Sequence, residues 1–193
     1  MNAPDDRPAK VVTASETVMT EMIMPNDTNP LGNLMGGNLL RWMDVCAAVC
    51  AGKHCENHVV TASVDHVNFT QPIAVGDVIT IKSRVTRAFR TSCEVVTEVY
   101  SADVRGHHAR LCNTAYLTFV AVDYETRQPV RVPGVHPVTA EEQRHFDGAL
   151  RRRELRLVLS GRLAPADATH LRSLFRPEVS VETGDQAAQP SRE

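Results

Sequence analysis

The sequence has little that points to a membrane protein, a secreted protein or a nucleic-acid binder. It contains no run of about 18 apolar residues, so we expect no membrane-spanning helix. The first ten residues, MNAPDDRPAK, carry two acids and no apolar stretch, unlike a secretory signal. The formal net charge of −2 over 193 residues favours neither nucleic acid nor a membrane surface as a partner. With 42% hydrophobic residues, the chain is typical of a globular domain with extensions, and we expect it in the cytoplasm.

The cysteines lack the spacing of disulfide frameworks and zinc sites. They number five, and no CxxC pair occurs, so we expect reduced and mostly buried thiols. Cys46 and Cys50 share the apolar side of a predicted helix, which indicates core thiols rather than ligands or nucleophiles. The stretch HCENH at residues 54–58 has two histidines four apart, but no glutamate follows the first. It falls at a helix end, so we expect no metal site and no cofactor.

Two further patterns are missing: the G-x-S-x-G elbow of α/β-hydrolases, and the strand–helix alternation of parallel sheets. One helical pattern covers residues 37–53, with an apolar stripe formed by Leu39, Met43, Cys46 and Cys50. Segments of period two follow at residues 59–69, 78–89, 92–103 and 108–123. In the last of these, one face is expected to carry Leu111, Asn113, Ala115, Leu117 and Phe119. A long helix followed by a meander of strands predicts an α+β fold with an antiparallel sheet.

Composition divides the chain into four parts. Residues 1–10 are expected to be disordered, and residues 11–138 to form the main domain. Thr139 and Glu142 match a capping box, so a charged helix is expected over residues 139–161. Its basic block, residues 151–156, is a solvated face, a phosphate contact or a subunit contact. Residues 162–193 are expected to be a disordered tail, apart from a short helix over ATHLRSLF.

A glycine pair, Gly36-Gly37, lies where a turn-rich loop becomes the predicted helix. Backbone N–H groups are unpaired at a helix start, and glycine lets a ligand approach them closely. Such a corner can bind an anion, or an oxygen that becomes one in a transition state. A plain tight contact between helix and strand is the alternative. Asn29, before Pro30 in the same loop, is a turn former whose amide can also donate to a carbonyl or position a water.

Asp44 lies within the apolar helical run, seven residues after Gly37. That separation is about two helical turns, or roughly 10 Å along the axis. Asp44 shares a helix face with Leu40 and Ala47, so its carboxylate is expected at the border of the buried stripe. A half-buried carboxylate can hold water or act as a base. The alternative is a surface aspartate paired with Arg41 or with solvent.

The segment TNPLGNLMGG at residues 28–37, continued by Trp42-Met43-Asp44, resembles the signature of hotdog-fold acyl-CoA thioesterases. Further segments match in order, and the resemblance spans residues 12–156. They are VDHVNF at 64–69 with Pro72, VGD at 75–77, RTS at 90–92 and TFVAVD at 118–123.

The resemblance implies a hotdog fold, in which a long central helix is wrapped by an antiparallel sheet. It implies homodimers, assembled as a trimer of dimers into a homohexamer, with acyl-CoA bound at the dimer interface. Asp44 would be the general base or water-holding carboxylate. Asn29 would be a second polar catalytic group, facing Asp44 of the partner subunit. The amides of Gly36 and Gly37 would polarise the thioester carbonyl.

The resemblance also implies where the rest of the substrate binds. Arg90, Thr91 and Ser92 match a segment along the nucleotide end of coenzyme A, and Asn68 lies in a segment near the pantetheine arm. The expected reaction is hydrolysis of acyl-CoA to a free carboxylic acid and coenzyme A, a reaction of fatty acid metabolism.

Two other functions use the same fold. A non-catalytic acyl-CoA-binding regulator carries an added DNA-binding helical unit, which we do not expect from the short, acidic N-terminal residues. A hotdog dehydratase places a histidine near the helix start, and residues 29–45 contain none. Asn29 and Asp44 together therefore favour hydrolysis.

Overall fold

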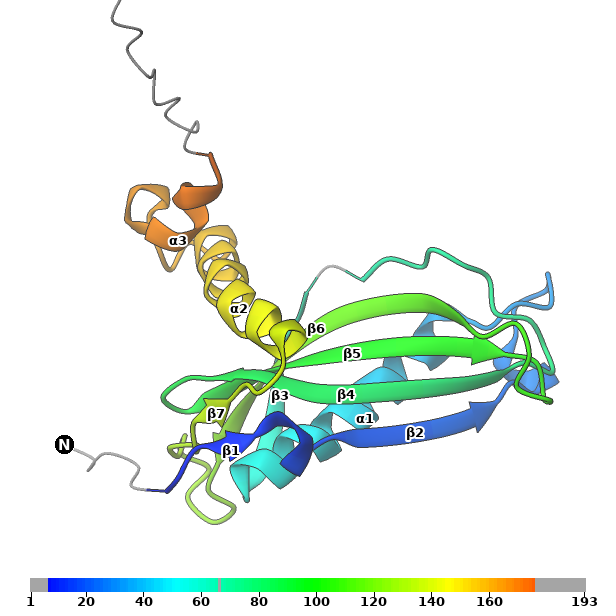
Figure 1. Cartoon of the computed structure of the whole chain (residues 1–193), viewed down its shortest axis with the longest axis horizontal. Helices are drawn as coiled ribbons and strands as arrows, with labels where there is room; N and C mark the ends of the chain where they lie inside the picture. The colour runs from blue at the N-terminus through cyan, green and yellow to red at the C-terminus, as the bar shows by residue number, and fades with distance from the viewer. Residues whose placement is uncertain (1–6, 66, 176–193) are drawn as a thin grey trace, which may run out of the picture. The chain divides into compact units, whose positions relative to one another are not determined.

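The computed structural model describes residues 7–65 and 67–175 (Figure 1). The chain divides into two compact units, with the boundary between Ala149 and Leu150. Among the described residues, no helix combines the length and the apolar character that crossing a bilayer needs.

The first unit is built from one long helix and a five-stranded antiparallel sheet (Figure 1). Helix α1, Gly36–Cys55, packs along the sheet, whose strand order is β2-β4-β5-β6-β3. The strands are β2 Thr17–Met22, β3 His58–Asp65, β4 Val78–Ala88, β5 Ser92–Ala102 and β6 Arg110–Val122. A second, parallel pair joins β1 Lys10–Val11 to β7 Val135–His136. The α+β architecture of a helix wrapped by an antiparallel sheet is confirmed.

The apolar stripe predicted for the helix is the face of α1 that contacts the sheet. Its four members, Leu39, Met43, Cys46 and Cys50, are each at most 3% exposed. The facing strands contribute alternate residues at period two, among them Ile79, Ile81, Val85, Val95 and Val99, which are fully buried. Residues that repeat every 3.6 positions on the helix therefore pack against residues that repeat every second position on the strands, and together they form one core.

Strand β6 departs from simple alternation at a bulge. The pairing of β5 with β6 shifts where Val99 pairs with Asn113 and Tyr100 pairs with Leu111. Cys112 falls between these pairs and is buried, whereas Leu111 is 46% exposed. The prediction that Leu111 shares a face with Asn113 is therefore wrong. The extra residue at the bulge, Cys112, breaks the alternation, so the side chains of Leu111 and Asn113 point to opposite faces of the sheet.

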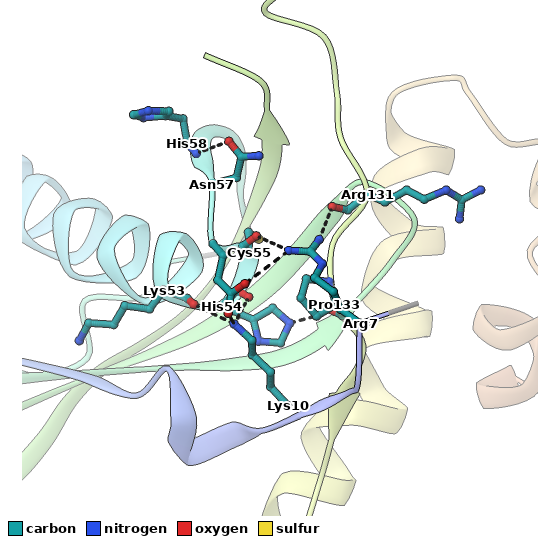
Figure 2. Close-up of polar contacts among 10 residues, drawn as sticks. Arg7, Lys10, Lys53, His54, Cys55, Asn57, His58, Arg131 and Pro133 are labelled. Carbon is teal, nitrogen blue, oxygen red and sulfur yellow. Dashed lines mark hydrogen bonds and ion pairs between the residues drawn. The ribbon is translucent and has the colours of Figure 1, made fainter. Parts of the chain in front are cut away.

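Residues near the N-terminus bind the C-terminal end of α1 (Figure 2). The ammonium of Lys10 donates to the backbone oxygens of Lys53 and His54, at 3.2 and 2.9 Å. The guanidinium of Arg7 donates to the backbone oxygen of Cys55 at 3.2 Å. Cations are favourable here because the last carbonyls of a helix are unpaired and carry partial negative charge. Of the segment expected to be disordered, Arg7 and Lys10 thus contact the helix, and residues 1–6 lie outside the described residues.

Helix α2, Ala140–Leu159, begins with the predicted capping box. The Thr139 hydroxyl accepts from the Glu142 amide at 3.2 Å, and the Glu142 carboxylate accepts from the Thr139 amide at 3.0 Å. In the second unit, Glu154 accepts from the Leu171 amide at 2.7 Å. Of the expected tail, residues 162–175 hold η3 Pro165–Asp167, α3 Thr169–Arg172 and η4 Ser173–Phe175, and residues 176–193 lie outside the described residues.

Candidate active site

Asp44 projects from α1 toward the edge strand β3. The hydroxyl of Thr61, on β3, donates to Asp44 Oδ1 at 2.8 Å. Asp44 is half-buried, and within the described chain its second oxygen, Oδ2, accepts no hydrogen bond. No ion pair joins Asp44 to Arg41 among residues 7–65 and 67–175, so the alternative of a simple surface pair is not formed. One oxygen of the carboxylate is therefore held, and the other is available.

The Asp44–Thr61 pair lies in a cavity of about 390 Å³ with largely apolar walls. The lining residues are Leu40, Arg41, Met43, Asp44, Thr61, Val64, Val67 and Leu117. An apolar cavity with a few polar groups at one point is the common form of a small-molecule site. This arrangement can admit an acyl chain and hold a water molecule against the free carboxylate oxygen.

Sequence reasoning missed Thr61. The period-two pattern placed this residue on a strand, but no pattern in the sequence says which strand lies beside the polar position of the helix. β3 reaches Asp44 because it is the edge strand next to β6 and contacts α1 directly.

The start of α1 presents two glycines in different surroundings. Among the described residues, the amides of Gly36 and Gly37 donate to no acceptor. A Cβ at Gly37 would meet no atom within 4 Å, so this glycine faces open space. A Cβ at Gly36 would lie 3.1 Å from the ring of Phe69. The alternative of a tight packing contact thus applies at Gly36, whereas a side chain at Gly37 would face open space, and the Gly37 amide has no acceptor among the described residues.

The side-chain oxygen of Asn29 accepts hydrogen bonds from its own loop. Oδ1 accepts from the amides of Leu31 and Asn33, at 2.9 and 3.2 Å. These bonds hold the amide group in one orientation, and its NH₂ donates to no acceptor in the described chain. No hydrogen bond joins Asn29 to Asp44 within the described residues of one subunit.

The segments expected along coenzyme A lie at different ends of α1. Asn68 is near the helix start, where its backbone oxygen accepts from the side chain of Asn113 at 2.6 Å. Arg90 and Thr91 lie in the β4–β5 turn, and Ser92 begins β5. The next residue, Cys93, has its sulfur 3.8 Å from the sulfur of Cys55, the last residue of α1. A helix of 20 residues is about 30 Å long. One chain therefore does not bring Arg90–Ser92 together with Gly36–Gly37.

The thiols do not contribute a nucleophile to this site. All five cysteines are free and buried, which confirms the expected core thiols. Burial raises the pKa of Cys50 to about 12, and it also raises the pKa of Cys46. A thiol with a raised pKa is a poor nucleophile at neutral pH. Among the described residues, no group of three or more His, Cys, Asp or Glu side chains could hold a metal ion.

Comparison with known proteins gives consistent matches. Residues 31–106 match the thioesterase superfamily. The chain is 38% identical over 142 residues to the uncharacterized acyl-CoA thioester hydrolase YkhA of Bacillus subtilis, covering 74% of this chain and 80% of YkhA. The structure of an apo hexameric acyl-CoA thioesterase is similar with a TM-score of 0.77 at 39% identity, over 80% of this chain and 98% of that one.

A third match is the acyl-CoA hydrolase of Staphylococcus aureus in complex with butyryl coenzyme A, coenzyme A and coenzyme A disulfide. It has a TM-score of 0.74 at 34% identity, over 88% of this chain and 100% of that one. Structures of three variants of that hydrolase, in which an aspartate, a threonine or an asparagine is replaced by alanine, match with TM-scores of 0.74 to 0.75. From the fold, the sequence identity and its coverage, the chain belongs to the family of hotdog-fold acyl-CoA thioesterases.

Proposed function

We propose that this chain hydrolyses acyl-CoA to a free carboxylic acid and coenzyme A, with Asp44 as general base or water-positioning carboxylate. The observation that carries the proposal is the half-buried Asp44 in an apolar cavity, held through one oxygen by Thr61 at 2.8 Å. Water attacks the thioester carbonyl carbon and gives a proton to Asp44. The carbon–sulfur bond then breaks, and the thiolate of coenzyme A takes up the proton.

The Thr61 hydroxyl gives the carboxylate a fixed orientation. It donates to Oδ1, so the lone pairs of Oδ2 remain to accept a hydrogen bond from water. A positioned base typically contributes on the order of 10²–10⁴ to a rate. Part of this rate contribution comes from positioning, because a misplaced water molecule cannot approach the carbonyl carbon from the direction that the reaction needs.

The N-terminal amides of α1 supply the second part of the mechanism. Gly37 and Asp44 of one chain are about two helical turns apart, so in the proposed dimer the amides of one subunit act together with Asp44 of the other. The carbonyl oxygen gains negative charge in the transition state, and the Gly37 amide, which has no acceptor among the described residues, can donate a hydrogen bond to it. The helix start adds partial positive charge. Removing one donor of this kind typically costs on the order of 10²–10³ in turnover.

The variants of the S. aureus hydrolase support three residues of this site. In that protein, the replaced asparagine, aspartate and threonine are separated by 15 and 17 positions. Asn29, Asp44 and Thr61 have the same two separations in this chain. The match supports a shared role for the three residues, and it is independent of the hydrogen bond between Asp44 and Thr61.

A second copy of this chain completes the site. Within the described residues of one chain no hydrogen bond joins Asn29 to Asp44, and Arg90–Ser92 lie at the other end of α1 from Gly36–Gly37. The edge strand β3 exposes apolar side chains, with Val60 50% and Val64 47% exposed. An exposed, apolar edge strand favours pairing with another strand. We therefore propose a homodimer, assembled further into a hexamer, in which Asn68, Arg90, Thr91 and Ser92 contact coenzyme A.

Known assemblies of similar proteins support this oligomer. The apo acyl-CoA thioesterase described above is hexameric, and so is the thioesterase y2039 of Yersinia pestis, at 33% identity and a TM-score of 0.56. A cytoplasmic location and a role in fatty acid metabolism stay predictions from the sequence.

A thiol-release assay over acyl-CoA substrates of different chain lengths tests the proposal. We expect the wild type to release coenzyme A, and Asp44→Ala to lower kcat by on the order of 10² or more. Asp147→Asn is the control, because Asp147 is exposed on α2 and its side-chain oxygen accepts from Gln143, which an asparagine also allows. If the wild type binds acyl-CoA but releases no thiol from any chain length, the regulatory binding module is the correct function.

A further inference from the structure

The ring of Phe69 covers one of the two glycines at the start of α1. A Cβ built on Gly36 would lie 3.1, 3.3 and 3.6 Å from Cζ, Cε1 and Cε2 of that ring. Distances of 3.1 and 3.3 Å are below ordinary van der Waals contact, so a Cβ at position 36 would shift the ring by a few tenths of an ångström. Glycine at this position is therefore what lets an aromatic ring lie against the helix start.

The backbone on both sides of Phe69 is tied to β6. The side chain of Asn113 donates to the backbone oxygen of Asn68 at 2.6 Å. The hydroxyl of Thr70 donates to the backbone oxygen of Cys112 at 2.8 Å. Asn113 is 3% and Cys112 is 1% exposed, so both bonds anchor the loop to the core. The segment that carries the ring is thus tied to β6 on both sides of Phe69.

The rest of the ring faces space. Phe69 is 55% exposed, and it lines a second cavity of about 420 Å³ together with Leu34, Gly36 and Leu39. Gly37, the next residue, has no atom within 4 Å of a built Cβ. The ring therefore shields one N-terminal glycine and leaves its neighbour open.

We propose that Phe69 is a positioning residue for the reaction at this corner. Its ring excludes water from Gly36 and forms an apolar wall that holds the thioester carbonyl against the Gly37 amide. The inference rests on the proposed hydrolase function of the same corner. Exclusion of water strengthens a hydrogen bond to developing negative charge, and a fixed wall limits the poses of the thioester.

Three variants test the proposal in the thiol-release assay. Phe69→Ala removes the wall, so we expect kcat to fall on the order of 10-fold or more with a smaller change in KM. Phe69→Leu keeps an apolar side chain and should stay within about threefold of the wild type. Gly36→Ala displaces the ring and should also lower kcat. In the Phe69→Ala background, Gly36→Ala should have no further effect, because its target is absent.

Tyr124→Ala is the matched control. Tyr124 is an aromatic residue of similar exposure, 60%, after β6 and outside both cavities. We expect wild-type kcat and KM from this variant. Circular dichroism establishes that each variant is folded, and if Phe69→Ala does not fold, Phe69→Leu and Gly36→Ala decide the outcome.

Wild-type kcat and KM in the Phe69 and Gly36 variants would overturn the proposal, and so would additive losses in the double variant. Asp44→Asn, measured alongside, separates this inference from the reaction itself. An active wild type, an inactive Asp44→Asn and unaffected Phe69 variants contradict the role of Phe69 alone. No thiol release by the wild type contradicts both the role of Phe69 and the hydrolase function.

Discussion

Replacing Thr61 by valine removes the hydroxyl that holds Asp44 and keeps a β-branched side chain suited to strand β3. The bond to be lost is 2.8 Å long and has a carboxylate as its acceptor. Hydrogen bonds to charged groups contribute about 1.5–3 kcal/mol. If that free energy acts fully in the transition state, kcat falls roughly 10- to 150-fold. The free energy of unfolding should change less, by no more than about 0.5 kcal/mol, because Thr61 is exposed in the free protein and water can replace the lost bond there.

Steady-state thiol release measures kcat, and urea unfolding measures stability. Thr61→Ser keeps the hydroxyl and should retain most of the activity. Thr20→Val is the control on the opposite edge strand, β2, where the threonine is also exposed. Wild-type turnover in Thr61→Val would refute the idea that this hydroxyl orients the base. An equal loss in Thr20→Val would show that the loss comes from a change in the sheet.

Three further predictions concern the end of α1 and the thiols. Lys10→Met removes a cation from the last carbonyls of α1 and should lower the free energy of unfolding by about 0.3–1 kcal/mol in urea titrations. Burial lowers the pKa of His54, whose Nε2 donates to the backbone oxygen of Pro133 at 3.0 Å. The unfolded chain therefore binds more protons than the folded chain below pH ~6.5, so stability should fall on acidification by at most about 1.4 kcal/mol per pH unit from this group. His54→Gln should reduce the change of the free energy of unfolding with pH between pH 7.5 and 5.5. An unchanged pH dependence would mean that other groups cause it. Because all five cysteines are buried, a thiol reagent should modify almost none in the native protein and five in denaturant; rapid native modification would contradict the burial.

Much of the fold was predictable because it depends on local periodicity. The stripe from Leu39 to Cys50 became the buried face of α1, and the capping box at Thr139 and Glu142 formed as expected. The exception at Leu111 comes from a bulge, which the periodicity of a single segment cannot predict. A bulge depends on how two strands pair across the sheet, and the pairing partner is distant in sequence.

The candidate site was only partly predictable. The helical repeat placed Asp44 at the edge of the apolar stripe, where the structure has it half-buried. Thr61 and Phe69 were missed because their roles depend on which strand and which loop lie beside α1. The separation of Arg90–Ser92 from Gly36–Gly37 has a different reason. The order of motifs along the chain does not give the distance between the two ends of α1, near which these segments lie.

The most direct test of the central claim compares binding with turnover in Asp44→Asn. The amide is close in size to the carboxylate and can still accept from Thr61, but it cannot take a proton from water. Calorimetry should give a Kd for coenzyme A within about threefold of the wild type, since Asp44 lies in the cavity proposed for the acyl chain. The account predicts a kcat lowered on the order of 10² or more with binding intact. Wild-type kcat in this variant would contradict the assignment of Asp44 as the residue that directs water.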